Sequence, residues 1–119
     1  MPISKYEKGQ KGQTEAENFL QKNNYKILEK NFRTRTGEID LIAFDNKNGY
    51  IAFIEVKYRT STNYGLPSEA VGSKKQQKII RTALYYISKN KLSDRDFRFD
   101  VIEVLGTSVN HIENAFDLR

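Results

Sequence analysis

Two short segments place acidic side chains and an amine at the alternating spacing of β-strands. In GEIDLIAFD, residues 37–45, Glu38 and Asp40 alternate with apolar residues, and in FIEVKYR, residues 53–59, so do Glu55 and Lys57. Carboxylate oxygens are the ligands that Mg²⁺ and Mn²⁺ prefer. An amine beside such an ion can stabilise phosphate charge or orient a water molecule. The pattern is typical of a metal-dependent phosphodiester hydrolase.

An antiparallel hairpin across the polar loop 46–49 would bring these side chains together. This loop pairs Asp45 with Tyr50. Counting back along both strands then places Asp40 directly opposite Glu55, and Glu38 opposite Lys57. Two opposed carboxylates, with Cβ atoms ~5 Å apart, destabilise a sheet unless a cation lies between them. We therefore expect a Mg²⁺ or Mn²⁺ ion here. Glu38 has an equally good structural reading, an ion pair with Lys57 worth about 0.2–1 kcal/mol.

The elements that must position these groups follow from hydrophobic periodicity and turn residues. Thr14 and Glu17 have the spacing of a capping box, and Ser73 can cap the second helix. The predicted elements are a helix over 13–23, strands over 25–32, 38–45 and 50–59, a loop over 60–72, a helix over 73–91, a strand over 97–105 and a weaker strand around 109–114. This order predicts an α/β fold, with a mixed central sheet of about five strands flanked by helices and the 38–59 hairpin at its centre.

Length and composition exclude several classes of protein. The chain has 119 residues, enough for one core, which we expect over 13–119 after a flexible arm over 1–12. It has no cysteine, so disulfides and thiolate zinc sites are excluded, and with a single histidine we do not expect a histidine relay. The sequence has no signal-peptide pattern and no apolar run of the roughly 20 residues that a membrane span needs, so we expect a cytoplasmic protein without a membrane partner.

The net charge of +5 belongs to one predicted helix. Residues 73–91 carry six basic side chains and no acidic one. Such a face is often simply solvated, but the absence of balancing acids favours contact with a nucleic-acid backbone, DNA in particular. The predicted contact residues are Lys74, Lys78, Arg81 and Lys89, with Arg59 at the end of the hairpin.

Four other polar or aromatic residues receive structural interpretations. We expect Tyr85 and Tyr86 to lie in the core or at its rim. We interpret His111 as a surface histidine and Asp100 as one partner of an ion pair on a strand.

The residues Gly37-Glu38-Ile39-Asp40 and Glu55-Val56-Lys57 resemble the signature of the PD-(D/E)xK nuclease superfamily, which includes restriction endonucleases and archaeal Holliday-junction resolvases. Over roughly residues 9–105, the order of segments is similar to the small bacterial YraN-like family, which is regarded as resolvase-like. The resemblance implies a restriction-endonuclease-like fold. The site residues that it implies are Asp40 and Glu55 as metal ligands, the main-chain carbonyl of Val56 facing the metal, Lys57 as the catalytic lysine and Glu15 as an additional acid that shares or tunes the metal.

These observations predict a Mg²⁺- or Mn²⁺-dependent DNA endonuclease that hydrolyses phosphodiester bonds, with branched DNA as one candidate substrate. A junction resolvase would need two active sites and hence a dimer. Two alternatives remain open. The first is a nucleic-acid-binding module that has the fold but cuts nothing, and the second is a protein-interaction domain without affinity for DNA.

Overall fold

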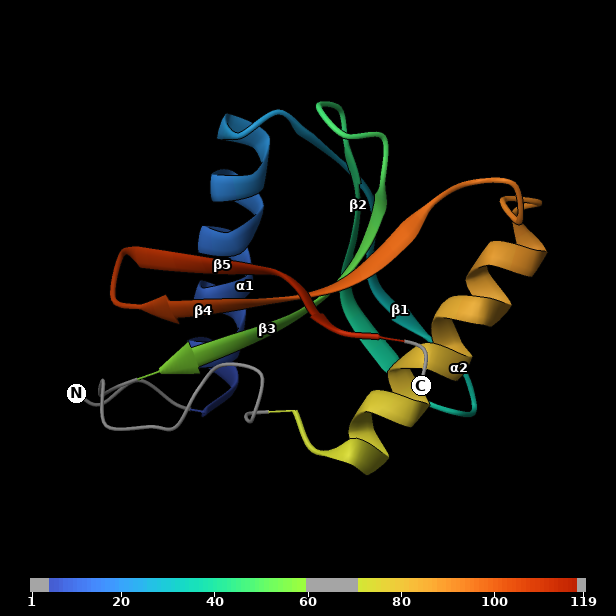
Figure 1. Ribbon diagram of the computed structural model, residues 1–119. Coiled ribbons are helices and arrows are strands. Elements are labelled where there is room, and N and C mark those ends of the chain that lie inside the picture. The colour runs from blue at the N-terminus through green and yellow to red at the C-terminus, as the bar shows by residue number, and fades with distance from the viewer. Residues whose placement is uncertain (1–4, 60–70, 118–119) are drawn as a thin grey trace.

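The computed structural model describes residues 5–59 and 71–117, with the backbone alone for residues 5–10. In these ranges, five strands and two helices form one α/β unit (Figure 1). The elements in chain order are α1 (Lys5–Lys22), β1 (Tyr25–Arg33), β2 (Glu38–Asp45), β3 (Ile51–Arg59), α2 (Ser73–Lys89), β4 (Phe97–Leu105) and β5 (Ser108–Phe116). The predicted α/β class and mixed five-stranded sheet are confirmed, and the arrangement is consistent with a restriction-endonuclease-like fold. The weak strand predicted around 109–114 is longer than expected.

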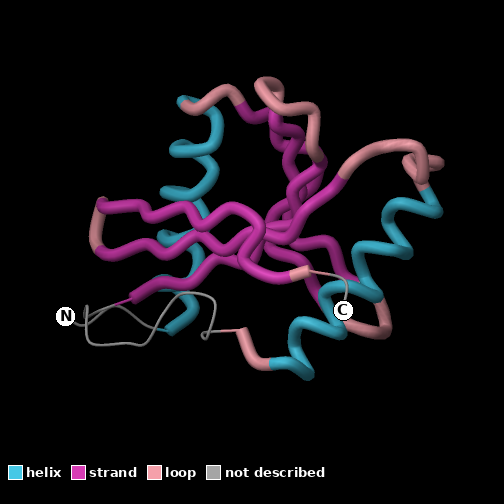
Figure 2. Tube along the Cα trace, in the orientation of Figure 1, coloured by secondary structure: helices cyan, strands magenta, loops and turns pink. Residues whose placement is uncertain are grey.

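The five strands lie in sequence order in a single sheet. Neighbouring strands are antiparallel, except that β3 and β4 are parallel and are connected through α2. The helices cover opposite faces (Figure 2), because successive residues of β2 enter different apolar clusters. Leu41 packs with Ala16 and Leu20 of α1, whereas Ile42 packs with Ile79 of α2. Neither described helix is long and apolar enough to cross a bilayer.

Helix α1 begins eight residues earlier than the sequence indicated. The expected boundary at residue 12 lies inside the helix, and residues 1–4 lie outside the described residues. The capping-box interpretation is wrong, because Thr14 and Glu17 lie in the interior of α1; Glu17 forms an ion pair with Lys30 of β1 at 2.9 Å. Gly12 belongs to the buried stripe, where an added Cβ would lie 3.1 Å from the ring of Tyr58. A glycine at this crowded position carries no apolar signal, which is why periodicity missed the first turns.

Helix α2 begins at the predicted residue, but with a different cap. Gly72 is the N-cap in an extended conformation, and no side chain caps the helix, so the prediction that Ser73 caps it is wrong. The predicted loop over 60–72 falls mostly outside the described residues. Tyr86 is buried as expected, whereas Tyr85 is 54% exposed.

The predicted hairpin register is confirmed over the turn end of β2 and β3. Residues Leu41 to Phe44 pair with Ile54 to Ile51, as the predicted register requires. The N–H of Asp45 donates to the carbonyl of Tyr50. The ladder ends at the pair of Leu41 and Ile54, one pair short of the predicted carboxylates. The two strands separate at this point, and the side chain of Asp40 accepts a hydrogen bond from β3 in place of a main-chain carbonyl.

A buried charge cluster holds the opposite ends of β2 and β3. The guanidinium of Arg98 donates to Asp45 and Asp100 at 2.9 and 3.0 Å, and it also bonds the hydroxyl of Tyr25. Asp100 is fully buried and lies 2.8 Å from Nε2 of His111. The expectation of a surface histidine is therefore wrong, since the His111 side chain is only 7% exposed. The residues of this cluster come from four strands, β1, β2, β4 and β5, so the spacing within any one segment does not reveal the whole set.

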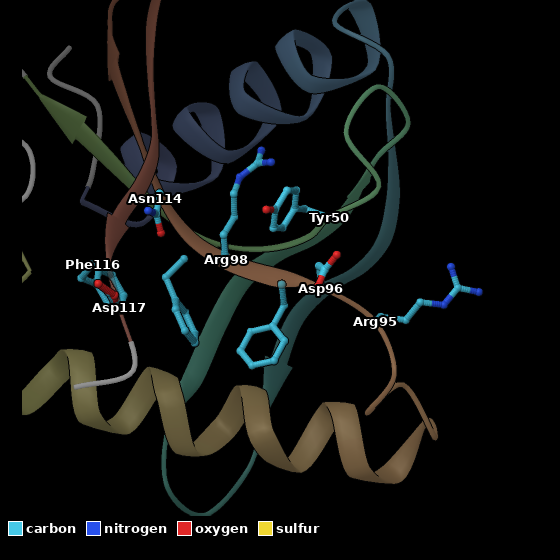
Figure 3. A pocket seen from close by; sticks show the side chains of 9 residues that line it. Tyr50, Arg95, Asp96, Arg98, Asn114, Phe116 and Asp117 are labelled. Carbon is cyan, nitrogen blue, oxygen red and sulfur yellow. The ribbon is translucent and has the colours of Figure 1, made fainter.

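The cluster is electrostatically compensated. Burial opposes ionisation of Asp45, but hydrogen bonds from Arg98, from Asn48 and from the N–H groups of Lys47 and Asn48 hold its pKa at about 2. Arg98 also borders a cavity of about 340 Å³ next to Tyr50 (Figure 3), with its guanidinium carbon 5.5 Å from the centre of that ring.

We expect Arg98→Met to lower the free energy of unfolding by about 3–5 kcal/mol, because it leaves two buried carboxylates without their cation. Urea denaturation at neutral pH measures this loss. The matched control is Arg95→Met, at an exposed position, which should change stability by less than about 0.5 kcal/mol. Equal stability of the two variants would contradict a structural role for the cluster.

Candidate metal centre

The carboxylate of Asp40 lies between β2 and β3. Its Oδ2 accepts the backbone N–H of Val56 at 2.8 Å, so a side chain joins the strands where their ladder has ended. Strict alternation would place Ile39 on the same face as Leu41, yet Ile39 belongs to the cluster on the α2 face and Leu41 to the cluster on the α1 face. Because the alternation is interrupted here, Asp40, which lies between these two residues, is turned towards β3. The nearby Asn31 of β1, with a φ of 51°, accompanies this irregularity.

Glu55 shares this site with Asp40. The Glu55 side chain is buried, at 7% exposure, and Asp40 is half-buried. Burial of its carboxyl group and the neighbouring charge of Glu55 raise the pKa of Asp40 from 3.8 to about 6, against the opposing effects of the Val56 N–H and of Lys75. Two acids that repel one another in a desolvated place are the arrangement that attracts a cation.

Two amines surround Glu55. Nζ of Lys57 lies 3.6 Å from its Oε1, and Nζ of Lys75 lies 2.7 Å from the same oxygen. Desolvation lowers the pKa of Lys57, an effect that the charge of Glu55 opposes and that of Lys75 increases. For Lys75, desolvation lowers the pKa, but the hydrogen bond to Glu55 and the charges of Glu55 and Asp40 together outweigh it and raise the pKa. In the sequence, Lys75 is one of six basic residues of its predicted helix, and no local pattern predicts its contact with Glu55.

The position of Lys75 on α2 explains its role. At 100° per residue, the exposed cations Lys74, Lys78 and Arg81 lie on one side of the helix, whereas Lys75 lies at the rim of the side that is buried against the sheet. A helical-wheel projection therefore separates it from the other lysines. Only the tertiary packing identifies Glu55 as its partner.

Two other acids that were expected near the site, Glu38 and Glu15, form no hydrogen bond with Asp40 or Glu55 within the part of the chain that the structure describes. Glu38 pairs with Arg33 of β1 at 3.1 Å, so the alternative of an ion pair with Lys57 is wrong. Glu15 is half-buried on α1, the helix on the other face of the sheet from α2. Among the described residues, it forms no hydrogen bond or ion pair with Asp40 or Glu55. Its role as an additional acid stays a prediction.

The donor set fits a hard divalent cation. Asp40 and Glu55 supply carboxylate oxygens, and the Val56 carbonyl faces the same gap as its N–H, because both groups of a strand residue point to the same side. Within residues 5–59 and 71–117, no group of three or more His, Cys, Asp or Glu side chains is arranged to hold a metal. Mg²⁺ commonly takes one or two carboxylates and completes its shell with water and substrate phosphate, so two suffice.

The predicted nucleic-acid contacts divide into two groups. Lys74, Lys78, Arg81 and Lys89 are exposed along α2. Arg59 is instead paired with Glu103 of β4 at 3.0 Å, with its side chain 19% exposed.

The sheet topology and the acid pair between its second and third strands define an α/β domain of restriction-endonuclease-like arrangement. The chain belongs to the uncharacterised protein family UPF0102, whose model matches residues 12–104. This confirms the family resemblance expected from the sequence.

Curated relatives with the same family name align over nearly the whole chain. A UPF0102 protein of Persephonella marina is 46% identical over 111 residues, which cover 93% of this chain and 94% of the relative. That of Trichlorobacter lovleyi is 50% identical, covering 92% and 90% respectively. That of Lachnoclostridium phytofermentans is 44% identical, covering 97% of each chain.

The raised pKa of Asp40 predicts a pH-dependent effect of Asp40→Asn. The folded state disfavours the ionised carboxyl group, so its cost to stability is full above pH 6 and disappears as the pH falls towards 3.8. The asparagine keeps an acceptor for the Val56 N–H. We expect the variant to be more stable than the parent by up to about 3 kcal/mol at pH 8 in EDTA, and equally stable near pH 4.

Urea denaturation across this pH range measures the difference. Asp94→Asn, at an exposed position, is the matched control and should show no pH-dependent gain. A gain for Asp40→Asn that is the same at pH 8 and pH 4 would show that repulsion and burial of charge are not its cause.

Proposed function

We propose that this protein is a Mg²⁺- or Mn²⁺-dependent endonuclease that hydrolyses phosphodiester bonds in DNA, with branched DNA among its substrates. The observation that carries the proposal is that the half-buried Asp40 carboxylate lies between the separated strands next to the buried Glu55, with the amine of Lys57 3.6 Å from Glu55. A cytoplasmic location, as expected from the sequence, belongs to the same proposal.

Each residue has a role that its surroundings support. Asp40 is held by the Val56 N–H with one oxygen committed, so the carboxylate keeps a fixed orientation toward a cation. Glu55 supplies the second carboxylate. The amine of Lys57, with its lowered pKa, would orient the attacking water or stabilise charge on the phosphate.

A divalent ion bound by this pair would polarise the phosphoryl oxygen and lower the pKa of a bound water molecule. The exposed cations of α2 would hold the DNA backbone beside it, which predicts affinity that falls as salt rises. The expected role of Glu15 is to share or tune this metal, and a cleavage assay tests this role as well.

The experiment is a cleavage assay on end-labelled duplex, single-stranded and four-way-junction DNA with Mg²⁺ or Mn²⁺. We expect cleavage with the ion and none in EDTA. Asp40→Asn, Glu55→Gln and Lys57→Met should each reduce the rate by about a hundredfold or more, because each removes a group that acts on the reacting phosphate.

The matched control is Lys26→Met, which removes an exposed strand lysine remote from the acid pair and should leave the rate unchanged. Cleavage that persists in Lys57→Met or Asp40→Asn at the parent rate would refute the assignment. A stable monomer in solution would argue against a junction resolvase, which needs two active sites to cut two strands.

One observation favours the non-catalytic alternative, a nucleic-acid-binding module. The ammonium of Lys75, 2.7 Å from Oε1 of Glu55, compensates the charge of this acid. If the site binds metal, Lys75 competes with it. Isothermal titration with Mn²⁺ should then show about fivefold tighter binding for Lys75→Met, since a partly exposed ion pair is worth up to about 1 kcal/mol.

Lys74→Met, at the neighbouring exposed position, is the control for charge alone. No Mn²⁺ binding by the parent or by Lys75→Met would favour the binding module over the enzyme.

A further inference from the structure

A groove with basic walls lies between α2 and the loop that joins β1 to β2, and it includes Arg81 and Lys89 from the exposed cations of α2. The groove there has a volume of about 560 Å³. Its basic and aromatic lining residues are Arg33, Arg35, Arg81, Lys89, Phe32 and Tyr85. The residues that line it include no acid, although Arg33 is paired with Glu38 just outside. The charge suits a polyanion.

An exposed aromatic ring lies within this basic surface. Tyr85 is 54% exposed, and its ring stacks on that of Phe32, with centroids 6.3 Å apart and planes 25° from parallel. Phe32 is held in turn by edge contact with Tyr86, at 5.1 Å. The inner neighbour orients the Tyr85 ring, while much of its surface stays open to solvent. A supported, exposed ring among cations is the usual platform for a nucleotide base.

The two walls of the groove are fastened together. The hydroxyl of Thr36 lies 3.2 Å from that of Thr82 on α2, and Thr82 donates to the carbonyl of Lys78 at 2.8 Å. Gly37 approaches the helix so closely that an added Cβ would lie 3.3 Å from both Lys78 and Thr82. The loop therefore presents its arginines at a fixed distance from Tyr85, which reduces the entropy lost on binding.

We propose that this groove binds an unpaired stretch of the DNA strand, with one base stacked on Tyr85 and the adjoining phosphates held by Arg35, Arg81 and Lys89. A base inside a duplex is already stacked on its neighbours, so the platform selects single-stranded DNA or the unpaired arm of a branched substrate. This proposal rests on the proposed function for the choice of DNA as ligand.

The groove and the metal centre share α2. Lys75 at the start of the helix contacts Glu55, and Tyr85 lies ten residues later, about 15 Å along the axis. An unpaired strand that follows the helix from Tyr85 would therefore reach the acid pair.

The test is fluorescence anisotropy in EDTA at low salt, which measures binding without cleavage. The probes are labelled twelve-nucleotide oligodeoxythymidine, a strand of equal length and charge with abasic residues, and a twelve-base-pair duplex. We expect the parent to bind oligodeoxythymidine about tenfold more tightly than the abasic strand, the effect of about one base–aromatic stack.

Tyr85→Ala should remove this preference by weakening oligodeoxythymidine binding about tenfold while leaving the abasic strand unchanged. Tyr85→Phe keeps the ring and should behave as the parent. Leu84→Ala, the adjacent and 45% exposed residue outside the groove lining, is the matched control. Arg81→Ala should reduce the slope of log affinity against log salt by about 0.7, the value for one phosphate contact on a single strand.

Three results would overturn the proposal: no binding of oligodeoxythymidine, equal loss for the thymidine and abasic strands in Tyr85→Ala, or tighter binding of the duplex. Failure of the proposed function is separate, because it appears as absent cleavage in Mg²⁺ or Mn²⁺ while the base preference in EDTA persists. Loss of the base preference with retained cleavage would refute the groove alone. Thermal unfolding of Tyr85→Ala and Tyr85→Phe verifies that both variants are folded.

Discussion

The carboxylate of Asp40 and the N–H of Val56 form the one hydrogen bond on which the geometry of the centre depends. It occurs where the ladder between β2 and β3 has ended, so it satisfies a backbone donor and fixes a carboxylate at once. In this position Asp40 is partly out of water and close to Glu55, and both effects raise the pKa of its carboxyl group, although the hydrogen bond itself lowers that pKa. The local opening of the sheet and the electrostatics of the site thus have a common origin.

Helix α2 adds three different surfaces to this arrangement. Its buried side packs Ile79 and Tyr86 against the sheet. Its first turn directs Lys75 to Glu55, and its exposed side carries cations with Tyr85 among them. Because a helix is rigid along its length, the distance between the acid pair and the aromatic platform is set by residue count.

Much of the fold could be predicted from the sequence, because strand alternation and the polar turn at 46–49 are local signals. They gave the hairpin register and hence the proximity of Asp40 and Glu55. The missing information was tertiary. Ser73 and the pair of Thr14 and Glu17 are suitable capping residues, but Gly72 is the N-cap of α2, and α1 begins at Lys5, before Thr14.

The site shows the same limit. The predicted register placed Asp40 opposite Glu55, but it did not predict that the β2–β3 ladder ends before this pair, since strand separation depends on contacts with other elements. Lys75 was hidden among six basic residues until packing gave it a partner in Glu55. The Arg98 cluster joins four strands at residues far apart in the chain, and no spacing rule identifies such a set. The far end of β2 and β3, held by this cluster, lies about five residues from the acid pair, or roughly 17 Å along a strand. The ion-paired cluster and the acid pair therefore occupy opposite ends of the same two strands, so a substitution at the acid pair leaves every contact of the cluster in place.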